Sequence, residues 1–176
     1  MLSIGGFYRR QKGMVLLISL VFLLVLSLIG LASMQGAVSQ QKMAGSIWHR
    51  NQSFQNAESG LRLGESIVQR SGALLPVCQS IANCAPPRES ASVVSAGTDP
   101  VSSITWVSVR GGLYGIQSLG QGAGLVNLPA DTPAALYRVT TVGLSGQSRT
   151  VLETVYAQVD GGGGSGFHRI LWRQLQ

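Results

Sequence analysis

The residues that could carry chemistry are few and far apart. Two cysteines, Cys78 and Cys84, have five residues between them, and the histidines His49 and His168 lie far from both. The cysteines favour a disulfide if this part of the chain is exported to an oxidising compartment. A metal site usually needs four ligands, and a thiol redox motif places two residues between its cysteines, so both of these interpretations are weaker.

Recognised catalytic motifs are also missing from the sequence. It contains no nucleophile elbow, phosphate loop, metal-binding helix motif or dinucleotide fingerprint. With only two histidines and seven acidic residues, few catalytic groupings are possible. We therefore expect no enzymatic activity, no metal and no cofactor.

The composition indicates a chain that lies partly in lipid. Only 11% of the 176 residues are charged, against about 25% in an ordinary soluble domain, while 45% are hydrophobic. The net charge of +6 could suggest a nucleic-acid partner, but Arg9, Arg10 and Lys12 supply half of it and lie beside an apolar run. No nucleic-acid partner is therefore expected.

A single apolar run, Met14 to Met34, contains 21 residues and no charge. As a helix it would be about 32 Å long, enough to cross a hydrocarbon core of about 30 Å. The basic residues before it place the N-terminus in the cytoplasm and the rest of the chain outside. A cleaved secretory signal would have a shorter apolar region and a small-residue cleavage site. A plain uncleaved anchor and a specialised processed anchor both fit the longer run.

The polar segment after this run, residues 35–71, predicts an amphipathic continuation of the same helix. Apolar residues recur at helical spacing, and no proline occurs before Pro76. Ser71 and Gly72 are a plausible stop. One helix from Met14 to Arg70 would be about 85 Å long. The apolar positions are Ile47, Phe54, Leu61 and Val68, with Ala57 and Gly64 beside them.

The remaining segment, residues 72–176, predicts a globular, β-rich head. Its two clearest strands are 135–142 and 150–159, joined by a loop at 143–149. An antiparallel sheet that packs its apolar face on the helix would make an α+β fold. The glycine run at 161–166 is either an engineered linker or a native loop. Weaker strands are expected at 103–109 and 113–119, loops at 85–103 and 120–133, and a last strand or edge segment at 170–175.

The residues directly before the apolar run resemble the leader of a type IV prepilin. A short basic segment ends in Lys12-Gly13-Met14. The resemblance implies that a prepilin peptidase removes residues 1–13 and methylates the new amine of Met14. Major pilins carry a glutamate at the fifth mature position, where this chain has Ile18. A minor component, placed near a filament end, is therefore implied.

The helical segment further resembles the N-terminal region of PilX-type minor pilins. Members typically carry a Gln-x-x-Met-Ala step and then an Arg-x-x-Ala-Phe-Gln-Ala-Ala-Glu-x-x-Leu-Arg pattern, and they often lack the fifth-position glutamate. Asn56 departs from the usual alanine. The matching positions here are Gln40 to Ala44, Arg50, Phe54 to Glu58, Leu61, Arg62 and Glu65.

Two interpretations remain open for these motif residues. Phe54, Ala57 and Leu61 are most simply core residues that pack the helix on the head. Glu58, Arg62 and Glu65 form an i, i+3/i+4 set, whose ordinary meaning is a solvated helix face. In the second interpretation, Glu58 and Glu65 set the register against the helix of a neighbouring pilin.

The resemblance implies a non-catalytic minor pilin that helps prime a type IV pilus and lies at or near its tip. Its partners would be other minor pilins, the major pilin, the prepilin peptidase and the inner-membrane assembly platform. The protein would first cross the inner membrane once, with a periplasmic head, and then enter the extracellular pilus. Two competing functions are a pseudopilin of a type II secretion system, which tends to have a larger head, and a membrane-anchored adhesin or DNA-binding head.

Overall fold

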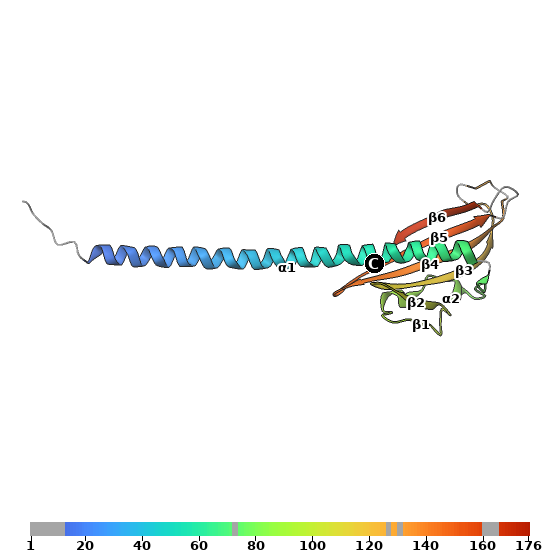
Figure 1. Ribbon diagram of the computed structural model, residues 1–176, viewed down its shortest axis with the longest axis horizontal. Helices are drawn as coiled ribbons and strands as arrows, with labels where there is room; N and C mark the ends of the chain where they lie inside the picture. Colours follow the sequence, from blue (N-terminus) through green and yellow to red (C-terminus); the bar gives the residue numbers. More distant parts are fainter. Residues whose placement is uncertain (1–12, 72–73, 126–127, 130–131, 160–165) are drawn as a thin grey trace, which may run out of the picture. The chain divides into compact units, whose positions relative to one another are not determined.

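The computed structural model describes residues 13–71, 74–125, 128–129, 132–159 and 166–176. Contacts divide the chain into two compact units, one up to Gly45 and one from Ser46 to Gln176. The elements in chain order (Figure 1) are helix α1 (Met14–Ser71), helix α2 (Ile81–Cys84), the 3-10 helix η2 (Arg88–Ala91) and strands β1 (Gly97–Thr98), β2 (Thr105–Val109), β3 (Gly112–Gly122), β4 (Ala134–Ser145), β5 (Ser148–Val159) and β6 (Gly166–Gln174).

Helix α1 confirms the expected continuity between the apolar run and the amphipathic segment. It begins at Met14 and ends at Ser71, one residue beyond the predicted end. The hydroxyls of Ser19 and Ser27 donate hydrogen bonds to the carbonyls of Leu16 and Leu23, so these polar groups are satisfied inside the helix. The predicted leader, residues 1–13, lies outside the described residues except for Gly13.

The six strands form one antiparallel sheet in the order β1-β2-β3-β4-β5-β6. The predicted strands 135–142 and 150–159 are confirmed as β4 and β5. The loop predicted at 143–149 is wrong, because both strands continue to the pair Ser145 and Ser148. Gly146, with φ of 54°, takes the first place of a two-residue turn, where a positive φ matches the twist of the strands.

The remaining sheet predictions are confirmed in outline. The predicted strands 103–109 and 113–119 are confirmed as β2 and β3, although β3 continues to Gly122, into the loop predicted at 120–133. The expectation of a final strand is confirmed by β6, which begins earlier than expected. The loop predicted at 85–103 instead contains η2 and the short strand β1. These elements escaped prediction because they are only four and two residues long. The predicted glycine run lies outside the described residues except for Gly166.

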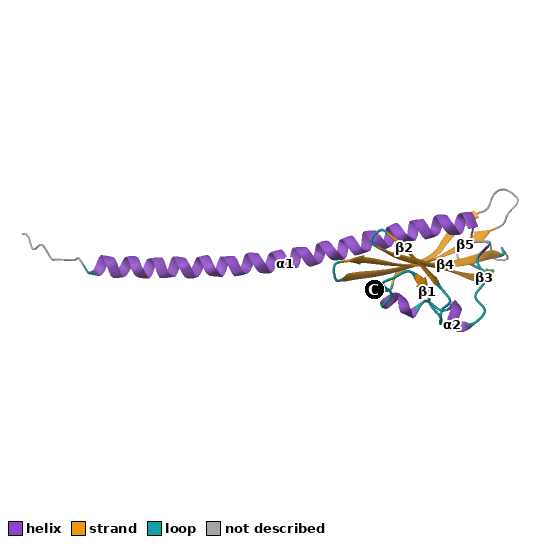
Figure 2. Ribbon diagram, turned by 60° about the horizontal axis from the view of Figure 1, so that its bottom comes forward, coloured by secondary structure: helices purple, strands orange, loops and turns teal. Residues whose placement is uncertain are grey.

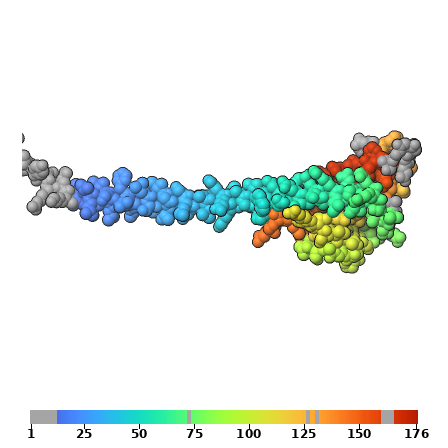
Figure 3. Space-filling view, in the orientation of Figure 1, coloured from blue at the N-terminus to red at the C-terminus, as the bar shows by residue number. Residues whose placement is uncertain are grey.

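The C-terminal half of α1 covers one face of the sheet (Figure 2). Its buried residues join β4 and β5 in a core of Ala57, Leu61, Val68, Tyr137, Val139, Leu152 and Tyr156. Figure 3 shows the green end of α1 on this face, with the red strand β6 on one side and yellow strands on the other. This half of the helix therefore belongs to the head.

The opposite face of the sheet has a second core, made with the segment between α1 and β2. It contains Ile104, Trp106, Leu113, Val142 and Val151. The Arg149 guanidinium crosses to this segment and donates hydrogen bonds to the carbonyls of Ser90 and Val93, at 3.0 and 2.9 Å. The sheet is thus covered on both faces, and the fold is an α+β, pilin-like arrangement.

Candidate assembly helix and processing site

The N-terminal half of α1 presents an apolar surface. The large apolar side chains from Met14 to Met34 are 46% to 70% exposed. Among the described residues, α1 is the one helix long and apolar enough to cross a membrane by length and composition. Such a surface is stable in lipid or against other apolar helices, but it is costly in water.

The predicted processing site lies where α1 begins. Gly13 is a turn residue and Met14 is the first residue of the helix, and both are exposed. Among the described residues, no atom lies within 4 Å of a Cβ built at Gly13. Cleavage between Gly13 and Met14 would leave α1 intact, because the helix begins at Met14.

Small residues let the C-terminal half of α1 approach the sheet closely. A Cβ at Gly64 would overlap Cγ1 of Val139, and one at Gly60 would lie 3.3 Å from Cγ2 of Thr141. On the sheet side, a Cβ at Gly143 would overlap the Ser53 carbonyl oxygen. Glycine on both surfaces therefore sets the distance between helix and sheet.

The structure places three of the predicted packing residues in the head. Ala57 is fully buried, Leu61 is 4% exposed, and Phe54 is partly buried against the same core. Ile47, the first residue of the predicted apolar stripe, is 54% exposed. The stripe thus begins to pack on the sheet only after Ile47.

The three charged residues of the predicted set have different surroundings. Glu65 accepts a hydrogen bond from the Tyr156 hydroxyl at 3.1 Å and lies 3.4 Å from the Arg169 guanidinium. Glu58 is partly buried and Arg62 is exposed, and neither makes a hydrogen bond or ion pair with any residue that the structure describes. Glu65 therefore connects α1 to β5 and β6, whereas Glu58 and Arg62 remain available to solvent or a partner.

Tyr156 and Arg169 complete the contact to Glu65. Burial raises the pKa of the Tyr156 phenol, because the charged form is disfavoured away from water. Burial alone would lower the pKa of Arg169, but its contacts to Tyr156 and Glu65 outweigh this effect and raise the pKa. Both groups thus keep their ordinary charge state at neutral pH.

Cys78 and Cys84 form a disulfide that closes a short loop. The loop is held against the sheet through its main chain. The Gln117 amide donates hydrogen bonds to the carbonyls of Asn83 and Ala85, and the Arg138 guanidinium donates to the Cys84 carbonyl at 2.6 Å. The disulfide therefore pins a segment that the sheet already positions.

Asn56, the departure from the usual alanine, has a structural role. Its amide donates a hydrogen bond to the Leu144 carbonyl at 2.9 Å. It also lies directly over the β2–β3 turn, where a Cβ at Gly111 would overlap the Asn56 side chain. Gly111 has φ of 77°, which also favours glycine. Asn56 thus joins α1 to the ends of β3 and β4.

Sequence reasoning missed a buried charge cluster on the face of the sheet opposite α1. Glu153 is fully buried and lies 3.5 Å from the Arg138 Nε and 2.8 Å from the Arg173 Nη2. Burial lowers the pKa of Arg138, while the Glu153 carboxylate acts in the opposite direction. The sequence did contain one signal for this cluster. A single charged residue lies in the middle of each of the two clearest predicted strands, Arg138 in 135–142 and Glu153 in 150–159.

The comparison with protein families bears on the N-terminal part of the chain. Residues 12–62 match the family described as PilX N-terminal. No curated protein and no solved structure matches the chain. The matched segment contains Gly13, Met14, the whole apolar run and the motif from Phe54 to Arg62. This match confirms the resemblance to PilX-type type IV pilins over residues 12–62 and fits a membrane-anchored pilus component.

Proposed function

We propose that this protein is a minor pilin that helps prime assembly of a type IV pilus and is incorporated at or near the pilus tip. The observation that carries the proposal is the match of residues 12–62 to a PilX N-terminal region, which includes a glycine directly before the apolar helix. The role is structural and involves no catalysis.

The proposed life cycle begins in the inner membrane. Residues 14–34 cross the bilayer once, with the leader in the cytoplasm and residues 72–176 in the periplasm. The prepilin peptidase cuts after Gly13 and methylates Met14. Residues 35–71 then continue the helix into the head, and oxidation of Cys78 and Cys84 follows export.

The tip position rests on residue 18. A carboxylate at the fifth mature position of a major pilin would pair with the N-terminus of a neighbour. The residue at this position here is Ile18, which is uncharged and cannot form that pair. Isoleucine avoids the cost of an unpaired carboxylate in lipid. The subunit therefore fits a filament end better than the repeating body. Its partners are other minor pilins, the major pilin and the inner-membrane assembly platform, with Glu58 and Arg62 available for contacts between helices.

The proposal is tested in a strain that lacks this chain and is complemented, in parallel, with the wild-type chain or with a variant. Loss of the chain should reduce surface pili and twitching, and the wild-type chain should restore both. Gly13→Val should fail to restore them, because a bulky residue blocks cleavage, and mass spectrometry should find its residues 1–13 still attached. Gly6→Val is the matched control, since it alters a leader glycine away from the cut.

Three results would contradict the proposal. Unchanged piliation in the deletion strain would remove the role in pilus priming. If the deletion instead abolished secretion of folded enzymes and left pili intact, the protein would be a pseudopilin of a type II secretion system. A wild-type chain whose Met1 is retained in the mature protein would leave only a plain membrane anchor.

A further inference from the structure

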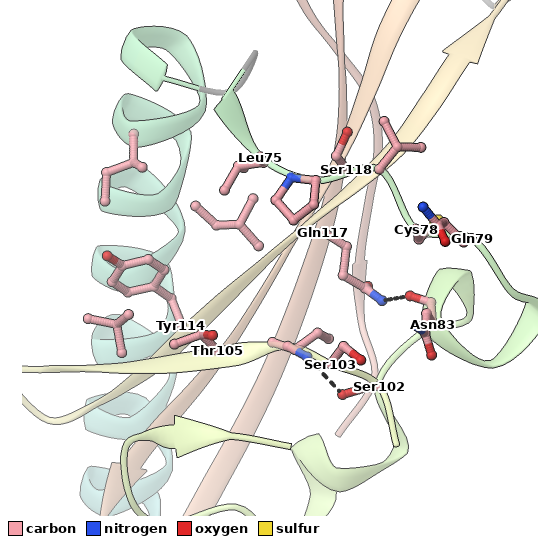
Figure 4. Close-up of a pocket in the computed structure, with 16 residues that line it drawn as sticks. Leu75, Cys78, Gln79, Asn83, Ser102, Ser103, Thr105, Tyr114, Gln117 and Ser118 are labelled. Carbon is pink, nitrogen blue, oxygen red and sulfur yellow. Dashed lines mark hydrogen bonds between the residues drawn. The ribbon is translucent and has the colours of Figure 1, made fainter. Parts of the chain in front are cut away.

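The head contains a cavity of about 440 Å³ beside β3 (Figure 4). We call it the β3 cavity. It is lined by the end of α1, the segment 75–79, residues 102–107 and β3 from Tyr114 to Ser118. Pockets that hold small organic molecules typically have volumes of about 300–1,000 Å³. The β3 cavity is therefore large enough for a molecule of this kind.

The lining of the β3 cavity is apolar and neutral. Its apolar wall consists mainly of Ile67, Leu75, Val77, Val107 and Ile116. None of the described residues that line the cavity carries a charged side chain. A charged ligand is therefore disfavoured, because it would lose water without gaining a partner of opposite charge.

The floor of the cavity presents alternate residues of β3. Successive side chains of a strand point to opposite faces of the sheet, so Tyr114, Ile116 and Ser118 share one face. Ile116 packs against the core that α1 forms with the sheet, which places all three on the face that α1 covers. The floor thus consists of one apolar side chain between two hydroxyl groups.

The two hydroxyl groups are nearly buried and have no partner. Tyr114 is 7% exposed and Ser118 is 6% exposed, and neither side chain makes a hydrogen bond with any residue that the structure describes. Neither hydroxyl oxygen is among the buried polar atoms that solvent cannot reach, so both are open to the cavity. Burial raises the pKa of the Tyr114 phenol, which therefore stays protonated and able to donate a hydrogen bond.

The occupant of the cavity must be compact. Tyr114 pairs with Val107 of β2, and Ser118 is bridged by Val77, so the edge of β3 is closed at both ends of the cavity. An extended chain could not lie along this edge. A small molecule needs no such length and can contact the apolar wall and both hydroxyls together.

We propose that the β3 cavity binds a small, uncharged and largely apolar organic molecule, which accepts hydrogen bonds from Tyr114 and Ser118 through a carbonyl-type oxygen. The apolar part of the ligand gains from leaving water, and its oxygen supplies the partner that the two hydroxyls lack. A carbonyl oxygen has two lone pairs and can accept from both groups. This inference is independent of the pilus assignment, because it depends only on the head.

The experiment titrates the full-length, isotope-labelled protein in neutral detergent micelles with the ketone benzylacetone. Amide chemical shifts should move at Tyr114, Ile116 and Ser118. Butylbenzene, which lacks the oxygen, should bind more weakly, and the anion phenylbutyrate should not bind. Tyr114→Phe and Ser118→Ala should each weaken benzylacetone binding about two- to tenfold, because each removes one hydrogen bond. Thermal unfolding should change little in both variants, since neither hydroxyl has a partner in the free protein.

Two tryptophan variants separate binding in the cavity from ketone that enters the micelle. Val107 lines the cavity and is 40% exposed, so Val107→Trp should fill the cavity and abolish the shifts. Val94 is 70% exposed and lies outside the cavity, so Val94→Trp should leave them unchanged. Partition into the micelle is the same for both variants. Absence of shifts in the wild type, equal binding of phenylbutyrate, full binding by Val107→Trp, or full binding by Tyr114→Phe and Ser118→Ala combined would overturn the proposal.

Discussion

At the scale of single residues, the buried Glu153 is the most consequential group in the head. One carboxylate serves two guanidinium groups, and the two differ in exposure, since the side chain of Arg138 is 12% exposed and that of Arg173 is 43% exposed. A charge that is taken out of water is tolerated only beside a partner of opposite sign. Glu153 therefore makes the burial of Arg138 possible and also ties β6 to β5.

We expect Glu153→Gln to lower the free energy of unfolding by about 3–5 kcal/mol, because it leaves Arg138 buried without a counter-charge. Thermal unfolding of the full-length protein in micelles, followed by circular dichroism, measures the effect. Arg173→Gln is the matched control and should cost less, since Arg173 is more exposed and its loss leaves Glu153 with Arg138. Equal stability of Glu153→Gln and the wild type would contradict this account.

Asp99 gives the head a specific sensitivity to acid. The N–H groups of Ser102 and Val101 donate hydrogen bonds to its carboxylate, and they lower the pKa of Asp99. A lowered folded-state pKa means that this stabilisation is present above the unfolded-state value of about 4. It is lost as the pH falls below that value and through the lower pKa of the folded state.

The difference in stability between the wild type and Asp99→Asn should therefore shrink as the pH is lowered from 6 to 3. Thermal unfolding at a series of pH values measures this difference. Glu58→Gln is the control, because Glu58 makes no hydrogen bond or ion pair with any described residue. A difference that stays constant over this range would show that the Asp99 carboxylate is not preferentially stabilised in the folded state.

At the scale of the elements, the contact between α1 and the sheet depends on missing side chains. Glycines normally weaken a helix by about 1 kcal/mol each relative to alanine. Gly60 and Gly64 are buried against Thr141 and Val139, whereas a Cβ at Gly45 would meet no atom within 4 Å. The same residue type therefore has a packing role at one end of α1 and none at the other.

Gly64→Ala should consequently destabilise the protein, whereas Gly45→Ala should not. The new methyl at residue 64 overlaps Val139, a stiff and fully buried side chain, and overpacking should cost about 1–3 kcal/mol before the gain in helix propensity is counted. Gly45→Ala should be neutral or slightly stabilising. Thermal unfolding of both variants measures this, and a stabilised Gly64→Ala would refute the close approach.

At the scale of the whole molecule, the two units differ in what their apolar residues contribute to the fold. The described residues from Gly13 to Gly45 are exposed throughout, and both hydrophobic cores of the head lie after Ser46. Apolar residues in the first unit therefore contribute surface for lipid or partners and no core. The fold of the head should not depend on them.

A chain that begins at Ser46 should fold with the same strand content and remain in solution without detergent. The full-length chain should require detergent, because α1 keeps its apolar residues exposed. Far-ultraviolet circular dichroism and sedimentation of both chains test this expectation. Aggregation or unfolding of the shorter chain would show that the first unit stabilises the head.

The sequence by itself determined the features that depend on local periodicity. An uncharged run of 21 residues, a helix without proline and strands with alternating side chains can each be identified from neighbours along the chain. The sequence also predicted a helix long and apolar enough to span a membrane, the α+β class and the resemblance of residues 12–62 to a PilX N-terminal region. The prediction of a hairpin loop at 143–149 was wrong, because the turn that begins at Gly146 has only two residues and so short a turn leaves little sign in the sequence.

Only the tertiary structure decided which residues meet across long separations. Glu65 with Arg169, Asn56 with Leu144, and Glu153 with Arg138 and Arg173 come from different elements, and their spacing in the chain contains no period that predicts contact. The cavity at β3 likewise arises where β2 departs and residue 77 arrives. Such features depend on packing between elements, which becomes defined only once the sheet and helix have come together.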